Sequence, residues 1–166
     1  MYIKKLFILF VLFLLTSEAS ANTPKSTGKY KNWESFSAVT EKGKICFAQS
    51  IPTKRAPGSI KRETSKLFVT FRPGENIKDE ISITSGHPYK ASTVTAKSGK
   101  SNFAFFSQDT FAWLLDNREE QSFIKLMKRA TNLTVKARTT KGAETTDNYS
   151  MMGFTKAYNT AKKTCG

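Results

Sequence analysis

The chain holds two cysteines, Cys46 and Cys165, and the 165 − 46 = 119 positions between them span most of its 166 residues. Because the N-terminus indicates export to an oxidising compartment, an even count with no other thiol favours a disulfide. Such a bond would join an early strand to the last helix and stabilise the fold by roughly 4 to 5 kcal/mol in the chain-entropy model. Two separate buried thiols are the alternative.

Residues 1–21 have the three parts of a secretory signal peptide. Lys4 and Lys5 give a cationic start, residues 6–15 carry no polar side chain, and Ala19-Ser20-Ala21 forms a cleavage site before Asn22. The apolar run is about half the roughly 20 residues that a membrane-spanning helix needs. We therefore predict cleavage between Ala21 and Asn22 and no transmembrane helix in the mature chain.

Short strand-like segments recur along the mature chain of 166 − 21 = 145 residues, a length typical of one domain. Residues 22–32 are Ser, Thr, Gly, Pro and Lys without an apolar pattern and predict a flexible leader. From residue 33, alternating segments follow one another about every ten residues, separated by turn residues. This spacing predicts a single mainly β domain over residues 33–166, an antiparallel sandwich or barrel.

Two helices are predicted within this β pattern. The first follows Asp116 or Asn117, either of which can cap it, and carries Glu119 and Glu120 in its first turn. The second begins at Gly153, and its residues at spacings of three and four form an apolar face that ends at Cys165. We expect both apolar faces to lie in the core.

The charge is strongly positive, with 27 Lys and Arg against 13 Asp and Glu in the whole chain. Removing the signal peptide leaves 27 − 2 = 25 cations and 13 − 1 = 12 acids, a net charge of +13. Such a charge favours anionic partners, such as lipopolysaccharide, acidic lipids or acidic glycans. A lysine-rich genome composition is the alternative explanation.

Residues 52–66 contain two prolines, one glycine and one acid, and predict a long exposed loop. The cations of this loop are the candidate anion-binding residues: Lys54, Arg55, Lys61, Arg62 and Lys66. A solvated connection is the alternative. The loop has no aromatic side chain to stack on a base, so we expect no nucleic-acid partner.

Catalytic groups are scarce. His87 is the only histidine and no serine nucleophile motif accompanies it, so we expect neither a catalytic triad nor a metal site. No glycine-rich phosphate loop predicts a bound cofactor. Carboxylates at Asp109, Asp116 and Asp147 leave an envelope-material hydrolase open as an alternative. Binding is favoured over catalysis.

An ordered series of motifs carries a family resemblance. Phe68-Val69-Thr70-x-Arg72-Pro73 and Ala112-Trp113 are followed by Thr145-x-Asp147-x-Tyr149-Ser150-x-x-Gly153-Phe154, with Cys165 behind them. With these motifs the chain resembles the invasion-associated locus B family of secreted alphaproteobacterial proteins. The resemblance implies an immunoglobulin-like antiparallel β-sandwich, exported to the periplasm, associated with the outer membrane, or secreted. It supplies no catalytic residue.

The residues and the resemblance together predict a non-enzymatic exported envelope protein. We expect a basic module that binds an anionic envelope component or an envelope protein. Host-cell adhesion and invasion, known for a few members of the family, is a second hypothesis.

Overall fold

A computed structural model describes residues 23–166, and the predicted signal peptide and its cleavage site lie outside that range. The fold is mainly β and antiparallel, with one inserted helix and one C-terminal helix, as predicted. The strands are β1 (Lys25–Tyr30), β2 (Trp33–Thr40), β3 (Gly43–Ser50), β4 (Lys54–Ala56), β5 (Lys66–Arg72), β6 (Ile77–Thr84), β7 (Val94–Ser98), β8 (Ser101–Gln108), β9 (Phe111–Trp113), β10 (Asn132–Arg138) and β11 (Glu144–Ser150). The helices are η1 (Pro73–Glu75, 3-10), α1 (Asn117–Arg129) and α2 (Phe154–Cys165).

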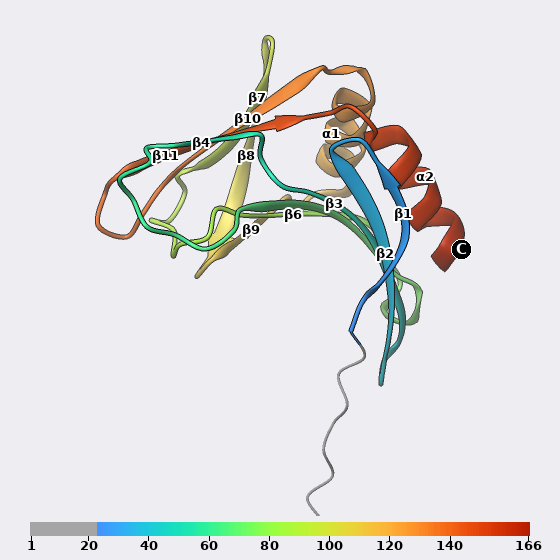
Figure 1. Cartoon of the computed structure of the whole chain (residues 1–166). Coiled ribbons are helices and arrows are strands. Elements are labelled where there is room, and N and C mark those ends of the chain that lie inside the picture. The colour runs from blue at the N-terminus through green and yellow to red at the C-terminus, as the bar shows by residue number, and fades with distance from the viewer. Residues whose placement is uncertain (1–22) are drawn as a thin grey trace, which may run out of the picture.

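The strands form two layers that share one continuous sheet, in the order β1-β2-β3-β5-β6-β9-β8-β7-β10-β11-β4. The layers are joined at β8, because Ser101–Phe105 pairs with β7 whereas Phe106–Gln108 pairs with β9. Figure 1 shows the β10–β11 layer above the β3–β6 layer. The sheet order ends at β1 and β4, so among the described residues the arrangement is a sandwich and not a closed barrel.

The predicted flexible leader is wrong for most of its length, because residues 25–30 form β1. Lys25 to Tyr30 pair antiparallel with β2, and the Tyr30 hydroxyl lies 2.8 Å from the Thr160 hydroxyl of α2. The sequence of β1 lacks the alternation of apolar and polar residues that predicts a strand. Its order comes from backbone hydrogen bonds to β2 and from this one aromatic anchor.

The core lies between the two layers and under the helices. On the β2–β5 side, Trp33 contacts Phe154 with ring centroids 4.8 Å apart, and Phe71 contacts Tyr158 at 5.6 Å. Both helices lie on the same side of the β3–β6 layer (Figure 1). As predicted, the apolar faces of both helices are buried in this core.

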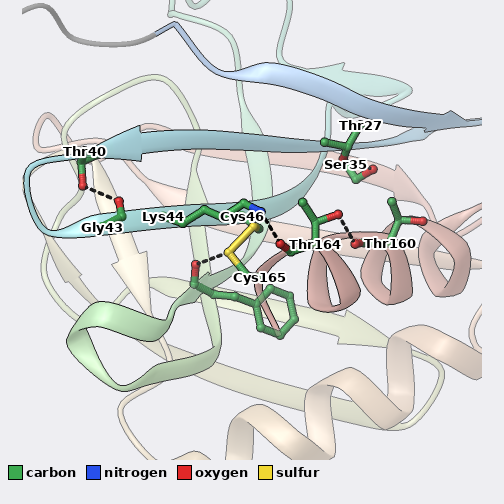
Figure 2. Close-up of a disulfide and its surroundings, with 10 residues drawn as sticks. Thr27, Ser35, Thr40, Gly43, Lys44, Cys46, Thr160, Thr164 and Cys165 are labelled. Atoms are coloured by element: carbon green, nitrogen blue, oxygen red, sulfur yellow. Dashed lines mark hydrogen bonds between the residues drawn. A yellow bond between two sulfur atoms is a disulfide. The ribbon is translucent and has the colours of Figure 1, made fainter.

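The predicted disulfide is confirmed. Cys46 of β3 and Cys165 of α2 are bonded, with their Cα atoms 5.7 Å apart (Figure 2). Close by, the Lys44 ammonium donates to the carbonyl oxygen of Thr164 at 2.6 Å. The end of α2 is therefore tied to β3 by one covalent and one charge-assisted bond.

Helix termini follow the local chemistry of the sequence. The carboxylate of Asp116 caps α1 by accepting from the backbone N–H groups of Arg118 and Glu119. Gly153 precedes α2 with φ of 98°, and a Cβ there would lie 1.8 Å from the carbonyl oxygen of Tyr30. Only glycine permits this approach, which brings the start of α2 against the β1–β2 turn.

Candidate functional site

The predicted cationic loop does not present its five side chains together. Its first part contains β4, which pairs with β11. The exposed fraction of the Arg62 side chain is only 2%. Its burial overturns the assignment of Arg62 as a ligand-binding residue, because a ligand would have to displace its internal partners.

Asp147 of β11 is the main partner of Arg62. The Arg62 Nη2 and Nη1 atoms donate to the Asp147 carboxylate oxygens Oδ1 and Oδ2 at 2.6 and 2.8 Å. Nη1 also lies 2.9 Å from the Ser65 hydroxyl and from the Ser85 carbonyl oxygen. Two parallel charge-assisted bonds in a buried setting hold the loop on the β11 layer.

The other four predicted residues divide between pairing and exposure. Arg55 lies 3.8 Å from Asp147 through its Nε atom and donates through Nη2 to the carbonyl oxygen of Glu63. Lys54 and Lys61 are exposed, and Lys66 is half-buried. The structure leaves two freely exposed cations in this loop where the sequence predicted five ligand-binding residues.

Two buried tyrosines, Tyr89 and Tyr149, feel the charges of the Arg62–Asp147 pair. Burial raises the pKa of Tyr89 to about 12 and raises the pKa of Tyr149 well above its usual value, and the nearby Asp147 charge acts in the same direction. Both phenols therefore stay neutral. The low polarity that keeps them neutral also strengthens the attraction within the ion pair.

His87 is held by two hydrogen bonds and is 7% exposed. Its Nδ1 lies 2.9 Å from the carbonyl oxygen of Pro88, and its Nε2 lies 2.9 Å from the Thr145 hydroxyl. A carbonyl can only accept, so in the neutral ring Nδ1 carries the proton and Nε2 accepts from Thr145. Both ring nitrogens are used in internal contacts.

The three carboxylates considered for hydrolysis have separate structural roles. Asp116 caps α1 and Asp147 pairs with Arg62. Asp109 lies in the β8–β9 turn with φ of 52°, and its carbonyl oxygen accepts from the N–H of Tyr89 at 2.8 Å. Within residues 23–166, no group of His, Cys, Asp and Glu side chains is arranged to hold a metal ion.

A different cationic region lies where the β1–β2 turn meets the start of α2. Two hollows of about 430 and 400 Å³ adjoin each other there, and Lys29 and Lys31 line both. Lys156, in the first turn of α2, lines the second hollow. We call Lys29, Lys31 and Lys156 the lysine hollow.

The charges of the lysine hollow are exposed and largely unneutralised. In the described part of the chain none of its three ammonium groups lies within ion-pair distance of a carboxylate, although Glu34 lines one hollow. Helix α2 has no acidic residue in its first turn, and its last turn holds Lys162 and Lys163. Sequence reasoning missed this region because the segment with Lys29 and Lys31 had been assigned to the leader.

A comparison with protein families shows to which family the chain belongs. The family model described as Invasion associated locus B (IalB) protein matches residues 33–162. The chain belongs to the IalB family. Comparisons with curated proteins and with solved structures gave no match. The family assignment confirms the resemblance carried by the sequence motifs.

The disulfide and the family bear on where this IalB-family protein works. Its disulfide and its family both fit an exported protein. Among residues 23–166, no helix combines the length and the apolar character needed to cross a membrane.

Proposed function

We propose that the protein is a non-enzymatic, exported binding module whose lysine hollow contacts an anionic component of the cell envelope. The carrying observation is that Lys29 and Lys31 line two adjoining hollows, that Lys156 lines the second, and that none of the three has a carboxylate partner among the described contacts. Phosphate or carboxylate groups of lipopolysaccharide, acidic lipid or acidic glycan are the matching chemistry. An anionic envelope protein would satisfy the same charges.

Electrostatics support this location over the loop of residues 52–66. A cation that is already paired must exchange one partner for another, and Arg62 has a bidentate partner. For the lysines of the hollow, binding an anion costs only the desolvation of their ammonium groups. The start of α2 adds the positive end of a helix dipole to the same place.

A non-enzymatic role is supported by the internal hydrogen bonds that the candidate catalytic groups make. His87 has both ring nitrogens in hydrogen bonds, and Asp147 has both carboxylate oxygens on Arg62. Either group would have to break these contacts to take part in proton transfer.

The test is sedimentation with vesicles of zwitterionic lipid, with and without anionic lipid, and with lipopolysaccharide aggregates. We expect the chain from Asn22 onward to bind the anionic particles at low salt and to be released as screening increases. Replacing Lys29, Lys31 and Lys156 by Ala should abolish binding. Equal binding by this triple variant would reject the lysine hollow as the site.

The matched control removes the same number of charges elsewhere, at the exposed residues Lys90, Lys100 and Lys141. This control should retain binding, because only net charge changes. A separate variant, Lys54→Glu with Lys61→Glu, tests the two loop cations that remain exposed. Loss of binding in that variant alone would return the site to the predicted loop.

Host-cell adhesion and invasion is the second candidate, and its support is the family description. It requires exposure on the outside of the cell. Protease treatment of intact bacteria separates the two proposals, because a periplasmic protein should survive it whereas a surface protein should be degraded.

A further inference from the structure

One layer of the sandwich has a second face that points away from both helices. The register places Phe36 opposite Phe47 and Trp113 opposite Phe106, and opposed residues of antiparallel strands point to the same side. The alternate positions, such as Cys46, point to the helix side. We call the following six residues the aromatic face: Phe36, Phe47, Phe68, Phe106, Phe111 and Trp113.

Five of the six rings of the aromatic face touch one another in two groups. Phe47 lies between Phe36 and Phe68, with ring centroids 5.2 and 6.0 Å away, and Phe111 stacks on Trp113 at 5.9 Å. Between the groups the register places only Ser82, which is 7% exposed, opposite both Phe68 and Trp113. The two groups of rings are therefore separated on β6 by one small, nearly buried polar side chain. Phe106 and Phe111 are 51% and 39% exposed, and grouped exposed aromatic rings of this kind mark an interaction site.

The aromatic face is on the inside of a bend. In Figure 1, α2 lies along the outside of the bend in β2 and β3, and the β8–β9 hairpin descends on the opposite side of the layer. Cys46 reaches α2 on the outside, so Phe47, its neighbour in β3, points to the inside.

Polar side chains border the rings of the aromatic face. Gln49 lies directly opposite Phe68, and Gln108 lies directly opposite Phe111. Glu80 lies on the same side of β6 as Ser82, and with Trp113 it lines a hollow of about 660 Å³ that extends to the start of α1. Rings that alternate with amide and carboxylate groups offer both apolar contact and directed hydrogen bonds.

We propose that the aromatic face binds an extended, β-linked glycan strand. A pyranose ring has apolar C–H faces and a rim of hydroxyl groups, which match aromatic rings bordered by amides and carboxylates. Phe68 and Trp113 lie two strands apart, about 10 Å, which is comparable with two linked sugar rings. A bound peptide strand would instead pair with a sheet edge, and the edges at β1 and β4 are elsewhere.

This inference does not depend on the anionic-ligand proposal, and salt separates the two. The six rings carry no charge, so glycan binding should persist at high salt, whereas contacts of the lysine hollow should be screened. The two surfaces adjoin through Glu34 and Gln49, which line one of the lysine-bordered hollows.

The experiment measures binding of chitohexaose and cellohexaose to the chain from Asn22 onward, with the bent α-linked maltohexaose as a comparison. Trp33 is 1% exposed, so changes in tryptophan fluorescence report mainly on Trp113. We expect saturable binding of at least one β-linked oligosaccharide, equal at low and high salt, and none of maltohexaose. Absence of binding of both β-linked probes would overturn the proposal.

Substitutions locate the site. Trp113→Ala and Phe106→Ala should each raise the Kd by about tenfold. Phe106 is 51% exposed, so its variant should fold even if the other does not. The matched control Val39→Ala removes another exposed apolar side chain, 59% exposed, outside the aromatic face and should leave the Kd unchanged.

Two results would reassign the aromatic face. Unchanged Kd values in both aromatic variants would place the sugar elsewhere. Concentration-dependent dimers in analytical ultracentrifugation, dissociated by Phe106→Ala, would show that a second copy of the chain covers the face.

Discussion

The two cationic regions of the molecule differ in whether their charges remain available. The loop of residues 52–66 has five cations in one run, yet Asp147 binds Arg62 and lies near Arg55. The lysine hollow assembles three cations from β1, the β1–β2 turn and α2, with no carboxylate within ion-pair distance in the described chain. A run of charge in sequence therefore does not measure available charge. Whether a cation stays available for a ligand depends on whether a buried acid on a neighbouring strand pairs with it.

The largest expected effect tests the paired region. Asp147→Ala leaves the Arg62 guanidinium buried without its partner, which should lower the free energy of unfolding by about 3 to 5 kcal/mol. Urea denaturation measures the change. Lys61→Ala removes an exposed charge from the same loop and should change stability by less than about 0.5 kcal/mol. Similar values for the two variants would mean that the ion pair does not hold the loop.

An effect of intermediate size tests the lysine hollow, whose charges stay available for a ligand. In Gly153→Ala the new Cβ meets the Tyr30 carbonyl oxygen in a left-handed backbone conformation, so we expect a loss of about 2 kcal/mol. The start of α2 must then move from the β1–β2 turn, which should also weaken binding to anionic vesicles.

Gly142→Ala is the control for backbone strain alone. Its φ of 88° is similar, but nothing lies within 4 Å of the added Cβ. This variant should lose less stability and should bind vesicles normally. Equal behaviour of the two glycine variants would contradict the close approach of α2 to the turn.

The smallest effect concerns a carboxylate among other acids. Burial raises the pKa of Glu120 to about 7 from 4.5, with nearby Glu80 and Asp79 adding to the shift, although the Ile81 N–H donates to it. Since the folded pKa is the higher one, this group stabilises the fold below pH 4.5 and the contribution is lost as pH rises through 7. Glu120 is partly exposed, so screening reduces the loss to about 1 kcal/mol.

Melting curves across that pH range provide the measurement. The wild type should lose stability as pH rises, and Glu120→Gln should flatten this dependence while keeping an acceptor for Ile81. Glu119→Gln, at an exposed position in the same turn, should leave the dependence unchanged. An identical slope in all three proteins would show that Glu120 does not titrate in this range.

Much of the fold follows from local sequence patterns. Strand alternation, the Asp116 cap, Gly153 before α2 and the Cys46–Cys165 pairing were all predictable, because each depends on a residue's own neighbours or on a count of two thiols. Strand β1 was not predictable in this way. It is ordered by pairing with β2, and its polar side chains give no periodic signal.

The site was harder to predict than the fold. Arg62 and Asp147 are 85 positions apart, and no pattern within the loop indicates that Arg62 is buried whereas Lys61 is exposed. One signal was present in β11, where Asp147 alternates with Thr145 and Tyr149 at buried positions. A carboxylate on the buried side of a strand requires a cation, and an arginine-bearing loop was the available source.

The bond between Cys46 and Cys165 closes a ring of chain that contains both helices and nine of the eleven strands at least in part. A protease that cuts a surface loop inside this ring opens it without releasing a fragment. The nicked chain keeps its mass until the disulfide is reduced, and both halves stay held at the same β3–α2 junction. A single cleavage by a protease would therefore damage the backbone without dispersing the domain.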